Sequence, residues 1–284
     1  MTTAAVTIGV LHPGEMGAAV AAEARRRGAR VLWYPVGRSQ ATHERARRAG
    51  LQPIHDLGEL LGQCEIVFSI CPPAAVQQVA AQVMHQGFKG LYVEANATSP
   101  QRSIRIADKM IESGAYFLDA AIFGPPPQAD TTACGLYVAG TPAAVETVAI
   151  LFEGTAVQVV RLDGAIGAAS ALKMAYSGYQ KTTRVLAAIA HALAGRYGVS
   201  QHLVAEARHA AGSPLAEPEQ LPSAAARAWR WTPELHEIAD ALEAEDLPST
   251  MALAAANLLF RWHDDKDDWS LSIEEVLEQL HEPT

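Results

Sequence analysis

One long stretch of apolar sequence, from Gly164 to Tyr197, constrains the fold of this chain most strongly. It contains no proline, it is rich in Ala, Leu and Met, and it begins with the glycines Gly164 and Gly167. These features predict a single helix from about residue 168 to residue 197, which would span about 45 Å at 1.5 Å per residue. Because most faces of this helix are apolar, we expect it to be buried on nearly every side.

One stripe of the predicted helix is polar. Lys173, Ser177, Gln180 and Arg184 recur at helical spacing, and His191 returns to the same side of the helix. Such a stripe can be a solvated edge along which the lysine reaches water. The helix would also begin where a strand-rich half of the chain ends and a helical half begins, and clefts between two such halves hold catalytic groups. Lys173 is therefore a candidate catalytic residue.

Before this helix, short apolar runs alternate with helical segments, a pattern typical of a doubly wound α/β sheet of parallel strands. The predicted strands cover residues 4–11, 30–34, 66–70, 91–94, 116–121, 136–139 and 156–162, and we expect about eight strands in all. After residue 164 no further strand is convincing. The chain should therefore consist of a Rossmann-like domain, residues 1–163, and an all-α domain, residues 164–284, joined by the long interdomain helix.

Three local signals predict helix starts in the second half. They are a cap residue before a proline at Thr232-Pro233-Glu234, the pair Pro248-Ser249, and a capping box from Ser272 to Glu275. The prolines between residues 213 and 223 predict a loop.

The turn after the first predicted strand indicates a nucleotide site. Its residues are His12, Pro13, Gly14, Glu15, Met16 and Gly17, and an Ala-rich helical segment follows. Strand, glycine turn and helix form the context of a dinucleotide fingerprint, in which the backbone approaches a pyrophosphate at the helix N-terminus. His12 stands where the first glycine of that fingerprint would be. Gly14 and Gly17 could also serve only a tight turn and close helix packing.

The loop after the second predicted strand bears on cofactor choice. NAD-preferring folds carry an acidic residue there for the ribose hydroxyls, and this chain has none. It has Arg38 and Ser39, whose guanidinium and hydroxyl suit a 2′-phosphate. Arg38 could instead cap a surface loop. We favour NADPH/NADP⁺ over NADH.

Two further loops follow strands whose carboxyl ends should face a bound cofactor. Cys71, Pro72 and Pro73 follow the third predicted strand, and Asn96 and Thr98 follow the fourth. We expect these residues near the nicotinamide, with Thr98 on the substrate side. Prolines in such places can also simply end a strand.

Composition excludes several function classes. The formal net charge of −9 argues against nucleic acid or an anionic membrane as the main partner. The three cysteines show no CxxC spacing, and neither a signal-like N-terminus nor an apolar run of membrane-spanning character is present, so we expect a reduced, cytoplasmic setting. No group of His, Cys and acidic residues has zinc-like spacing, and we predict no metal site.

Several motifs together resemble the β-hydroxyacid dehydrogenases, a group that includes the NADP-binding domain of 6-phosphogluconate dehydrogenase and the imine reductases. The motifs are HPGEMG, YVEANATSP, FLDAAIFG and GAIGAASALKMAYS. The later segment WRWTPELHEIADALEAEDLP is similar to the C-terminal domain of a phosphogluconate-dehydrogenase type. The resemblance covers nearly the whole chain and is most specific around the long helix.

The resemblance assigns roles along that helix. The family pattern GxxGxGxxxKxxxN falls on Gly164, Gly167, Ala169, Lys173 and Ser177. It implies that Lys173 is the catalytic acid/base, and that Ser177 replaces an asparagine that helps to hold the substrate.

A second family motif, DAPVSGG, reads DAAIFGP from Asp119 to Pro125 here. Phe123 therefore replaces a serine that would hold a substrate carboxylate, and family chemistry is better supported than the usual family substrate. The residues expected to face the substrate are Thr98, Phe123, Gly124, Tyr176 and Gln180. The short chain and the lack of a His-Asn pair after Lys173 argue against 6-phosphogluconate dehydrogenase itself.

The resemblance thus predicts an NADPH-dependent oxidoreductase that transfers hydride to or from a carbonyl or hydroxyl carbon of a small molecule, and a homodimer. One alternative is a reductase of C=N bonds in bulkier substrates. The other is an NADPH-binding sensor without turnover.

Overall fold

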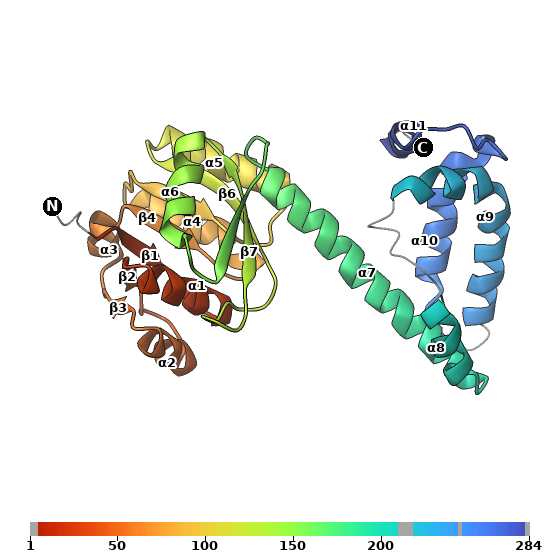
Figure 1. Cartoon of the computed structure of the whole chain (residues 1–284), viewed down its shortest axis with the longest axis horizontal. Coiled ribbons are helices and arrows are strands. Elements are labelled where there is room, and N and C mark those ends of the chain that lie inside the picture. Colours follow the sequence, from red (N-terminus) through yellow and green to blue (C-terminus); the bar gives the residue numbers. More distant parts are fainter. Residues whose placement is uncertain (1–4, 210–217, 244–245, 282–284) are drawn as a thin grey trace. The chain divides into compact units, whose positions relative to one another are not determined.

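The computed structural model describes residues 5–209, 218–243 and 246–281. Within these ranges it leaves undescribed the side chains of residues 73, 178, 180–182, 184–189, 191, 192, 209, 218, 230, 233, 234, 236–238, 240, 241 and 281. The chain divides into two compact units, Met1–Ser177 and Gly178–Thr284. Helix α7 (Ala168–Arg196) contributes to both units and confirms the predicted long helix (Figure 1). The domain boundary after residue 163 stays a prediction.

The first unit is built around one eight-stranded sheet, ordered β3-β2-β1-β4-β5-β6-β7-β8 (Figure 1). All neighbouring strands are parallel except β6 and β7, which are antiparallel. The strands are β1 (Thr7–Val10), β2 (Arg30–Trp33), β3 (Gln52–Pro53), β4 (Ile66–Ser69), β5 (Leu91–Glu94), β6 (Tyr116–Phe123), β7 (Cys134–Gly140) and β8 (Val157–Arg161). The order of β1 to β6 is that of a doubly wound nucleotide-binding sheet, so the predicted fold class is confirmed.

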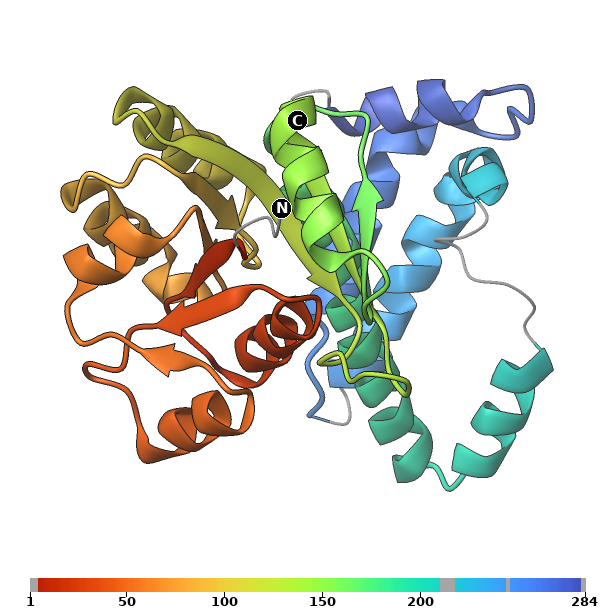
Figure 2. The same cartoon turned by 60° about the vertical axis from the view of Figure 1, so that its left-hand side comes forward.

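Helices cover both faces of this sheet (Figure 2). One face packs against α1 (Glu15–Arg26), α2 (Gln40–Arg48) and α6 (Pro142–Phe152), and the other against α3 (Leu57–Gln63), α4 (Val76–His85) and α5 (Pro100–Glu112). A short 3-10 helix, η1 (Pro73–Ala75), precedes α4. Successive strand residues serve opposite faces: Phe68 lies in the core with α1 and α6, whereas Val67 lies in the core with α3 and α4. Burial on both faces explains why the strands read as continuous apolar runs.

In the described part of the second unit every element is helical. Besides its share of α7, the unit contains α8 (Ser200–His209), η2 (Pro218–Gln220), α9 (Leu221–Glu243), α10 (Thr250–Leu259), η3 (Phe260–Asp265), α11 (Ile273–Glu278) and η4 (Gln279–His281). Small cores hold these helices together, such as the one in which Ala225 and Ala228 of α9 meet Trp262 and Val276. The indole Nε1 of Trp262 donates to the carbonyl oxygen of Val276 at 3.0 Å.

The helix start predicted at Thr232-Pro233 is wrong. Both residues lie inside α9, and the Thr232 hydroxyl donates back to the carbonyl oxygen of Ala228 at 2.9 Å. A cap residue before a proline is only a local signal. Ala228 and Ala239, on either side of Thr232 in the chain, are each buried in a hydrophobic core, and this packing stabilises α9 as one continuous helix. The other two predicted starts are confirmed, since α10 begins directly after Ser249 and a capping box at Ser272 opens α11.

Candidate functional site

A cavity of about 460 Å³ opens beside the point where the strand order reverses, between β1 and β4. The turn after β1, the loop after β2 and the exit of β4 form its walls. It is lined by His12, Gly14, Glu15, Met16, Gly17, Gly37, Arg38, Ser39, Thr42, Ile70, Cys71 and Pro72. Sheets of this kind bind nucleotides at this position, outside the carboxyl ends of their strands. Most of the predicted cofactor residues therefore converge on one cavity.

The two glycines of the turn have different structural roles. A Cβ atom on Gly17 would lie 2.5 Å from the carbonyl oxygen of His12, so only glycine lets α1 pack this closely on the turn. A Cβ atom on Gly14, which caps α1, would meet no described atom within 4 Å and would project into open space. Gly14 thus leaves room for a group at the N-terminus of α1, where unpaired N–H groups favour an anion. The carbonyl oxygen of buried Pro13, directly before Gly14, accepts a hydrogen bond from Nε of Arg45 at 3.4 Å.

The cavity presents a positive charge and buried polar atoms without a described partner. Burial, followed by the nearby charge of Arg38, lowers the pKa of His12 to about 4, so its imidazole is neutral at pH 7. Among the described residues, the His12 Nδ1 and the Arg38 Nε are buried and have no hydrogen-bond partner. Buried polar atoms are seldom left unpaired, and a phosphate-bearing ligand would supply acceptor oxygens to the guanidinium. The residues present therefore fit a nucleotide cofactor.

Ser39 and Thr42 place hydroxyl groups beside Arg38. Ser39 caps α2, and its Oγ accepts the backbone N–H of Thr42 at 3.3 Å. The Thr42 Oγ1 accepts a hydrogen bond from Nη2 of Arg45 at 3.1 Å. Sequence reasoning did not single out Thr42 or Gly37. The signal was present for Thr42, because a helix capped by Ser39 turns its third residue back toward the cap.

Asn96 is buried behind the cavity and holds the exit of β4. Its Oδ1 accepts the backbone N–H of Cys71 at 2.5 Å. Its Nδ2 donates to Ser69 Oγ at 2.9 Å and to Glu94 Oε1 at 2.5 Å. Each polar atom of the amide is thus used inside the protein, and a direct contact between Asn96 and the cofactor stays a prediction.

Two more buried groups belong to this region. Burial raises the pKa of the Glu94 carboxyl to about 7, and within the described part of the chain its Oε2 has no hydrogen-bond partner. The Thr98 hydroxyl, predicted to face the substrate, is likewise buried and unpaired among the residues described. Burial also raises the pKa of Cys71 to about 11, which keeps it a thiol at pH 7. The side chain of Pro73 lies outside the described residues.

Lys173 of α7 is held at the carboxyl end of β6. Its Nζ donates to the carbonyl oxygen of Ile122 at 2.5 Å and lies 4.5 Å from the centre of the Phe123 ring. That ring packs against Tyr137 and Tyr176, with ring centres 4.9 and 5.4 Å away. Since β6 runs parallel to β5, its carboxyl end lies at the same edge of the sheet as the nucleotide cavity. The ammonium is therefore held over the Phe123 ring at that edge.

The remaining predicted substrate residues flank this lysine along the chain. Gly124 directly follows β6 and has φ +104°, a conformation that favours glycine. Half-buried Ser177 lies one helical turn after Lys173. The side chains of Gln180, Arg184 and His191, which completed the predicted polar stripe, lie outside the described residues.

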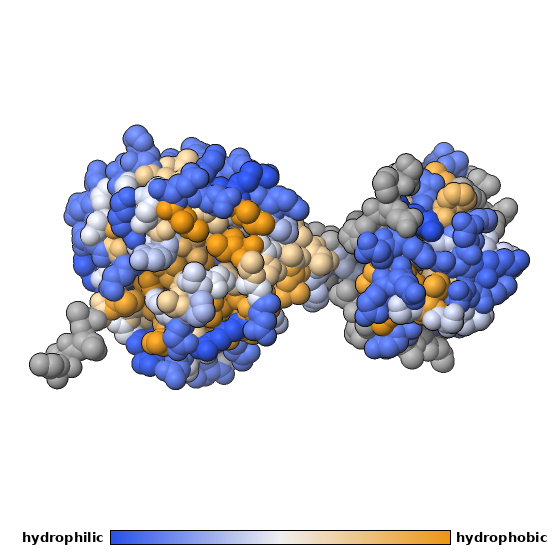
Figure 3. Space-filling model, turned by 90° about the horizontal axis from the view of Figure 1, so that it is seen from above, coloured by the Kyte–Doolittle hydropathy of each residue, from blue (hydrophilic) through white to orange (hydrophobic). Residues whose placement is uncertain are grey.

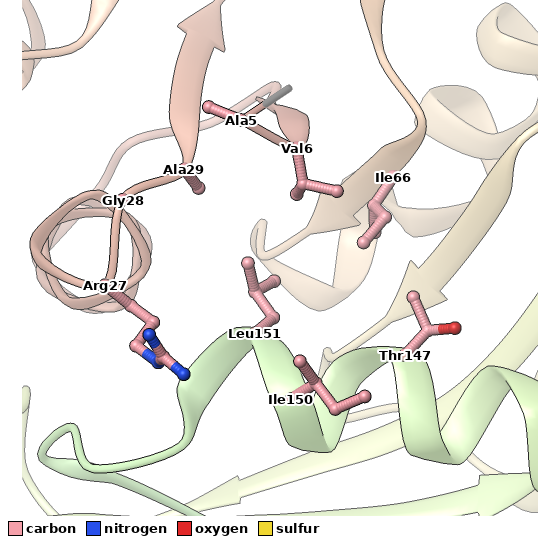
Figure 4. A pocket seen from close by; sticks show the side chains of 9 residues that line it. All are labelled: Ala5, Val6, Arg27, Gly28, Ala29, Ile66, Thr147, Ile150 and Leu151. Carbon is pink, nitrogen blue, oxygen red and sulfur yellow. The ribbon is translucent and has the colours of Figure 1, made fainter. Parts of the chain in front are cut away.

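A second cavity, of about 500 Å³, lies at the opposite edge of the sheet, where the strands begin (Figure 4). Apolar side chains such as Val6, Ile66 and Leu151 supply most of its lining. The charged Arg27 at this cavity is paired with Glu153, at 3.2 Å between Nη2 and Oε2. This cavity lacks the unpaired donors and the helix N-terminus that suit the first cavity to a nucleotide.

None of the helices described is long and apolar enough to cross a membrane. The described part of the chain contains no group of three or more His, Cys, Asp or Glu side chains that could hold a metal ion.

Comparison with known proteins gives matches over both halves of the chain. Residues 7–164 match the family described as the NAD binding domain of 6-phosphogluconate dehydrogenase, and residues 194–262 match a domain of unknown function, DUF1932. YqeC of Bacillus subtilis (strain 168), provisionally named a 6-phosphogluconate dehydrogenase, is 30% identical over 176 residues. That match covers 61% of this chain and 59% of the length of YqeC.

Solved structures share the fold over almost the whole chain. An imine reductase variant from Myxococcus stipitatus in complex with NAD⁺ has a TM-score of 0.72 at 17% identity, covering 96% of this chain and 99% of the other. The 3-hydroxyisobutyrate dehydrogenase of Mycobacterium tuberculosis, solved with L-serine, has a TM-score of 0.63 at 20% identity, covering 98% and 100%. At identities this low, the structural similarity shows a common fold.

Proposed function

Because the chain belongs to the family of the NAD binding domain of 6-phosphogluconate dehydrogenase, we propose that it is an NADPH-dependent oxidoreductase of the β-hydroxyacid dehydrogenase type. The observation that carries this proposal is the position of Lys173. Its ammonium is fixed at the carboxyl end of β6, at the same edge of the sheet as the nucleotide cavity. A bound nicotinamide supplies or accepts the hydride, and the chain supplies the proton.

In this proposal, cofactor binding and proton transfer are assigned to residues in different parts of the site. Gly14 and the first turn of α1 hold the pyrophosphate, while Arg38, Ser39 and Thr42 hold the 2′-phosphate. Lys173 gives a proton to the substrate oxygen in the direction of reduction and removes it in the direction of oxidation. Ser177, one turn later on α7, would support the substrate. Residues 1–163 then form the cofactor domain, and residues 164–284 form the domain for substrate and dimerisation.

A second candidate reaction is reduction of an imine, and the aromatic ring beside Lys173 favours it. Phe123 replaces the serine that would hold a carboxylate, and its ring, which packs against Tyr137 and Tyr176, lies beside the Lys173 ammonium. Aromatic faces attract cations, so a protonated cyclic imine suits this place better than a small hydroxy acid. Imine reductases are among the proteins that share this fold, which is consistent with this second candidate reaction.

Substitution of Lys173 tests the proposal. Lys173→Met keeps the length of the side chain and removes its proton, and it should lower turnover by the 10²–10⁴-fold typical of a lost acid/base group. NADPH binding, followed by nicotinamide fluorescence, should be nearly unchanged. The assay uses 3-hydroxy acids with NADP⁺ and cyclic imines with NADPH, so that the preferred probe also decides between the two reactions. Lys109→Met, an equal change at an exposed site on α5, is the matched control.

Two results would contradict the proposal. Turnover of Lys173→Met within about threefold of the parent would remove Lys173 from catalysis, because an acid/base group contributes far more. Tight binding of NADPH without hydride transfer to any probe of either class would favour the sensor interpretation.

A further inference from the structure

A buried carboxylate on β6 anchors the first turn of α7. Asp119 is fully buried, and its Oδ2 accepts the backbone N–H groups of Gly167 at 2.9 Å and Ser170 at 3.0 Å. Its Oδ1 accepts the Ser170 hydroxyl at 2.6 Å. The first N–H groups of a helix have no partner within the helix, and an anion beside them is further stabilised by the helix dipole. Asp119 therefore fixes both the height and the rotation of α7 against the sheet.

The same strand also holds the reactive end of Lys173. Ile122, whose carbonyl oxygen accepts the Lys173 ammonium, lies three residues after Asp119 on β6. On the helix, Lys173 lies three residues after Ser170, which is about one turn. Beside these two attachments the buried Ala121 of β6 and Ala169 of α7 pack in one apolar cluster, where small side chains let helix and strand approach closely.

We propose that Asp119 is a positioning residue that sets where the Lys173 ammonium stands at the edge of the sheet. This inference rests on the proposed function, in which Lys173 is the acid/base. The physical reason is rigidity: a helix held at its first turn by three hydrogen bonds to one carboxylate cannot rotate or slide without breaking them. A shift of about 1 Å at a catalytic group can cost about 10²-fold in rate, so this anchoring should matter for turnover.

The structure offers a matched pair of variants to test this role. Ser103 on α5 also donates its hydroxyl to Asp119 Oδ1, at 2.8 Å, and like Ser170 it is fully buried. Ser170→Ala and Ser103→Ala each remove one hydroxyl from the same carboxylate oxygen. Only Ser170 lies on the helix that carries Lys173. A role confined to stability should make the two variants alike, whereas a positioning role should separate them.

The primary readout needs no substrate. The chain has only five lysines, Lys89, Lys109, Lys173, Lys181 and Lys266, so reductive methylation with ¹³C-formaldehyde, which labels their amines and the α-amino group, gives a simple NMR spectrum. The Lys173 signal is the one lost in Lys173→Met. We expect Ser170→Ala to move or broaden this signal and leave the other four in place, and Ser103→Ala to leave all five in place.

Activity and stability provide the second readout. With the best probe of the substrate panel, Ser170→Ala should lower kcat about tenfold, an order of magnitude below the cost of a 1 Å displacement, with the KM for NADPH unchanged. Ser103→Ala should stay within about twofold, although both variants should lower the melting temperature. Asp119→Asn, which keeps the shape of the side chain and loses its charge, should lower both kcat and the melting temperature more than Ser170→Ala does.

The two levels of the proposal fail in different ways. Equal responses of the Lys173 signal in the two serine variants, or no response in either, would overturn the positioning role. Retained turnover in Lys173→Met would overturn the proposed function alone, because the NMR comparison reports the position of the ammonium whether or not it is catalytic.

Discussion

Arg38 is the charged side chain on which the choice of cofactor should mainly depend. Its Nε is buried and has no hydrogen-bond partner in the part of the chain that the structure describes. Ser39 and Thr42, which carry hydroxyl groups, line the same cavity. Arg38→Ala should weaken NADPH binding by roughly 1.5–3 kcal/mol, the range for hydrogen bonds to a charged group, and barely change NADH binding. Titration of both cofactors, followed by nicotinamide fluorescence, measures the difference.

A matched control separates this contact from the general loss of positive charge. Arg48→Ala removes the same charge from the exposed side of α2, where Arg48 faces Glu44 at 3.7 Å. It should change the binding of both cofactors little. If Arg38→Ala weakens NADPH and NADH equally, Arg38 does not distinguish the 2′-phosphate.

Glu94 should make the stability of the fold depend on pH. Burial raises its pKa from the ordinary 4.5 to about 7, so between these values the folded state binds more protons than the unfolded state. The contribution of Glu94 to stability is therefore full below pH 4.5 and is lost as the pH rises toward 7, by up to about 3 kcal/mol.

Replacing Glu94 isolates this effect. Glu94→Gln keeps the acceptor that Asn96 uses and cannot ionise, so above pH 7 it should be more stable than the parent. The difference in the free energy of unfolding between the two proteins should close as the pH falls to 4.5. His12 titrates alike in both proteins, so its contribution cancels in this difference. Urea unfolding between pH 4.5 and 8.5 measures it, and parallel curves for the two proteins would contradict the assignment.

Sequence reasoning identified the cavity residues because each follows the end of a parallel strand. That rule located the turn from His12 to Gly17, the loop with Arg38, and Cys71 at one edge of the sheet. The rule gives the edge and not the direction of each side chain, so the burial of Asn96 and Thr98 could not be predicted. Their direction is set by packing between strands that are distant in the chain.

At the level of elements, the strand–turn–helix unit of β1 and α1 carries the most direct test of the nucleotide site. Gly14→Ala places a methyl group in open space at the start of α1, so the fold should tolerate it and NADPH binding should weaken. Gly17→Ala places its methyl group against the carbonyl oxygen of His12, so it should lower the melting temperature as well as NADPH binding. Thermal unfolding and cofactor titration of the two variants measure both effects.

The two glycine variants therefore control each other. Unchanged NADPH binding in Gly14→Ala, together with unchanged stability, would show that the space above this turn is not used by the cofactor. Equal stability losses in the two variants would contradict the separate roles given to Gly14 and Gly17.

Element types followed from the sequence more reliably than element ends. The long helix and the buried strands were predictable because their period or apolar run extends over many residues, as α7 illustrates. The two-residue β3 and the passage of α9 through Thr232 and Pro233 were not, because both depend on contacts with other elements. The anchoring of α7 by Asp119 lay outside sequence reasoning for the same reason, since the partners are 48 and 51 residues apart.

At the scale of the whole molecule, both units expose apolar side chains, and those of the second unit indicate an interface with another chain. On the face shown in Figure 3, the first unit gathers hydrophobic residues at its centre with hydrophilic ones around them. In the second unit Leu258, Phe260, Leu277 and Leu280 are exposed on α10, η3, α11 and η4. Helix α10 leads directly into η3, and η3 contacts η4, so these four residues lie on neighbouring elements. Clustered exposed apolar residues are typical of protein interfaces.

We therefore expect the chain to form a homodimer through its second unit. Light scattering after size exclusion should give twice the chain mass of 30.2 kDa for the parent protein. The double variant Leu258→Glu with Phe260→Glu would bury unpaired carboxylates, each costing several kcal/mol, so its dissociation constant should rise at least about 100-fold and monomer should predominate. Tyr116→Glu, at the most exposed apolar residue of the first unit, should remain dimeric. A parent protein that stays at the chain mass at every concentration, or a double variant that stays dimeric, would contradict this expectation, because the exposed residues of α10 and η3 would then serve no interface between copies.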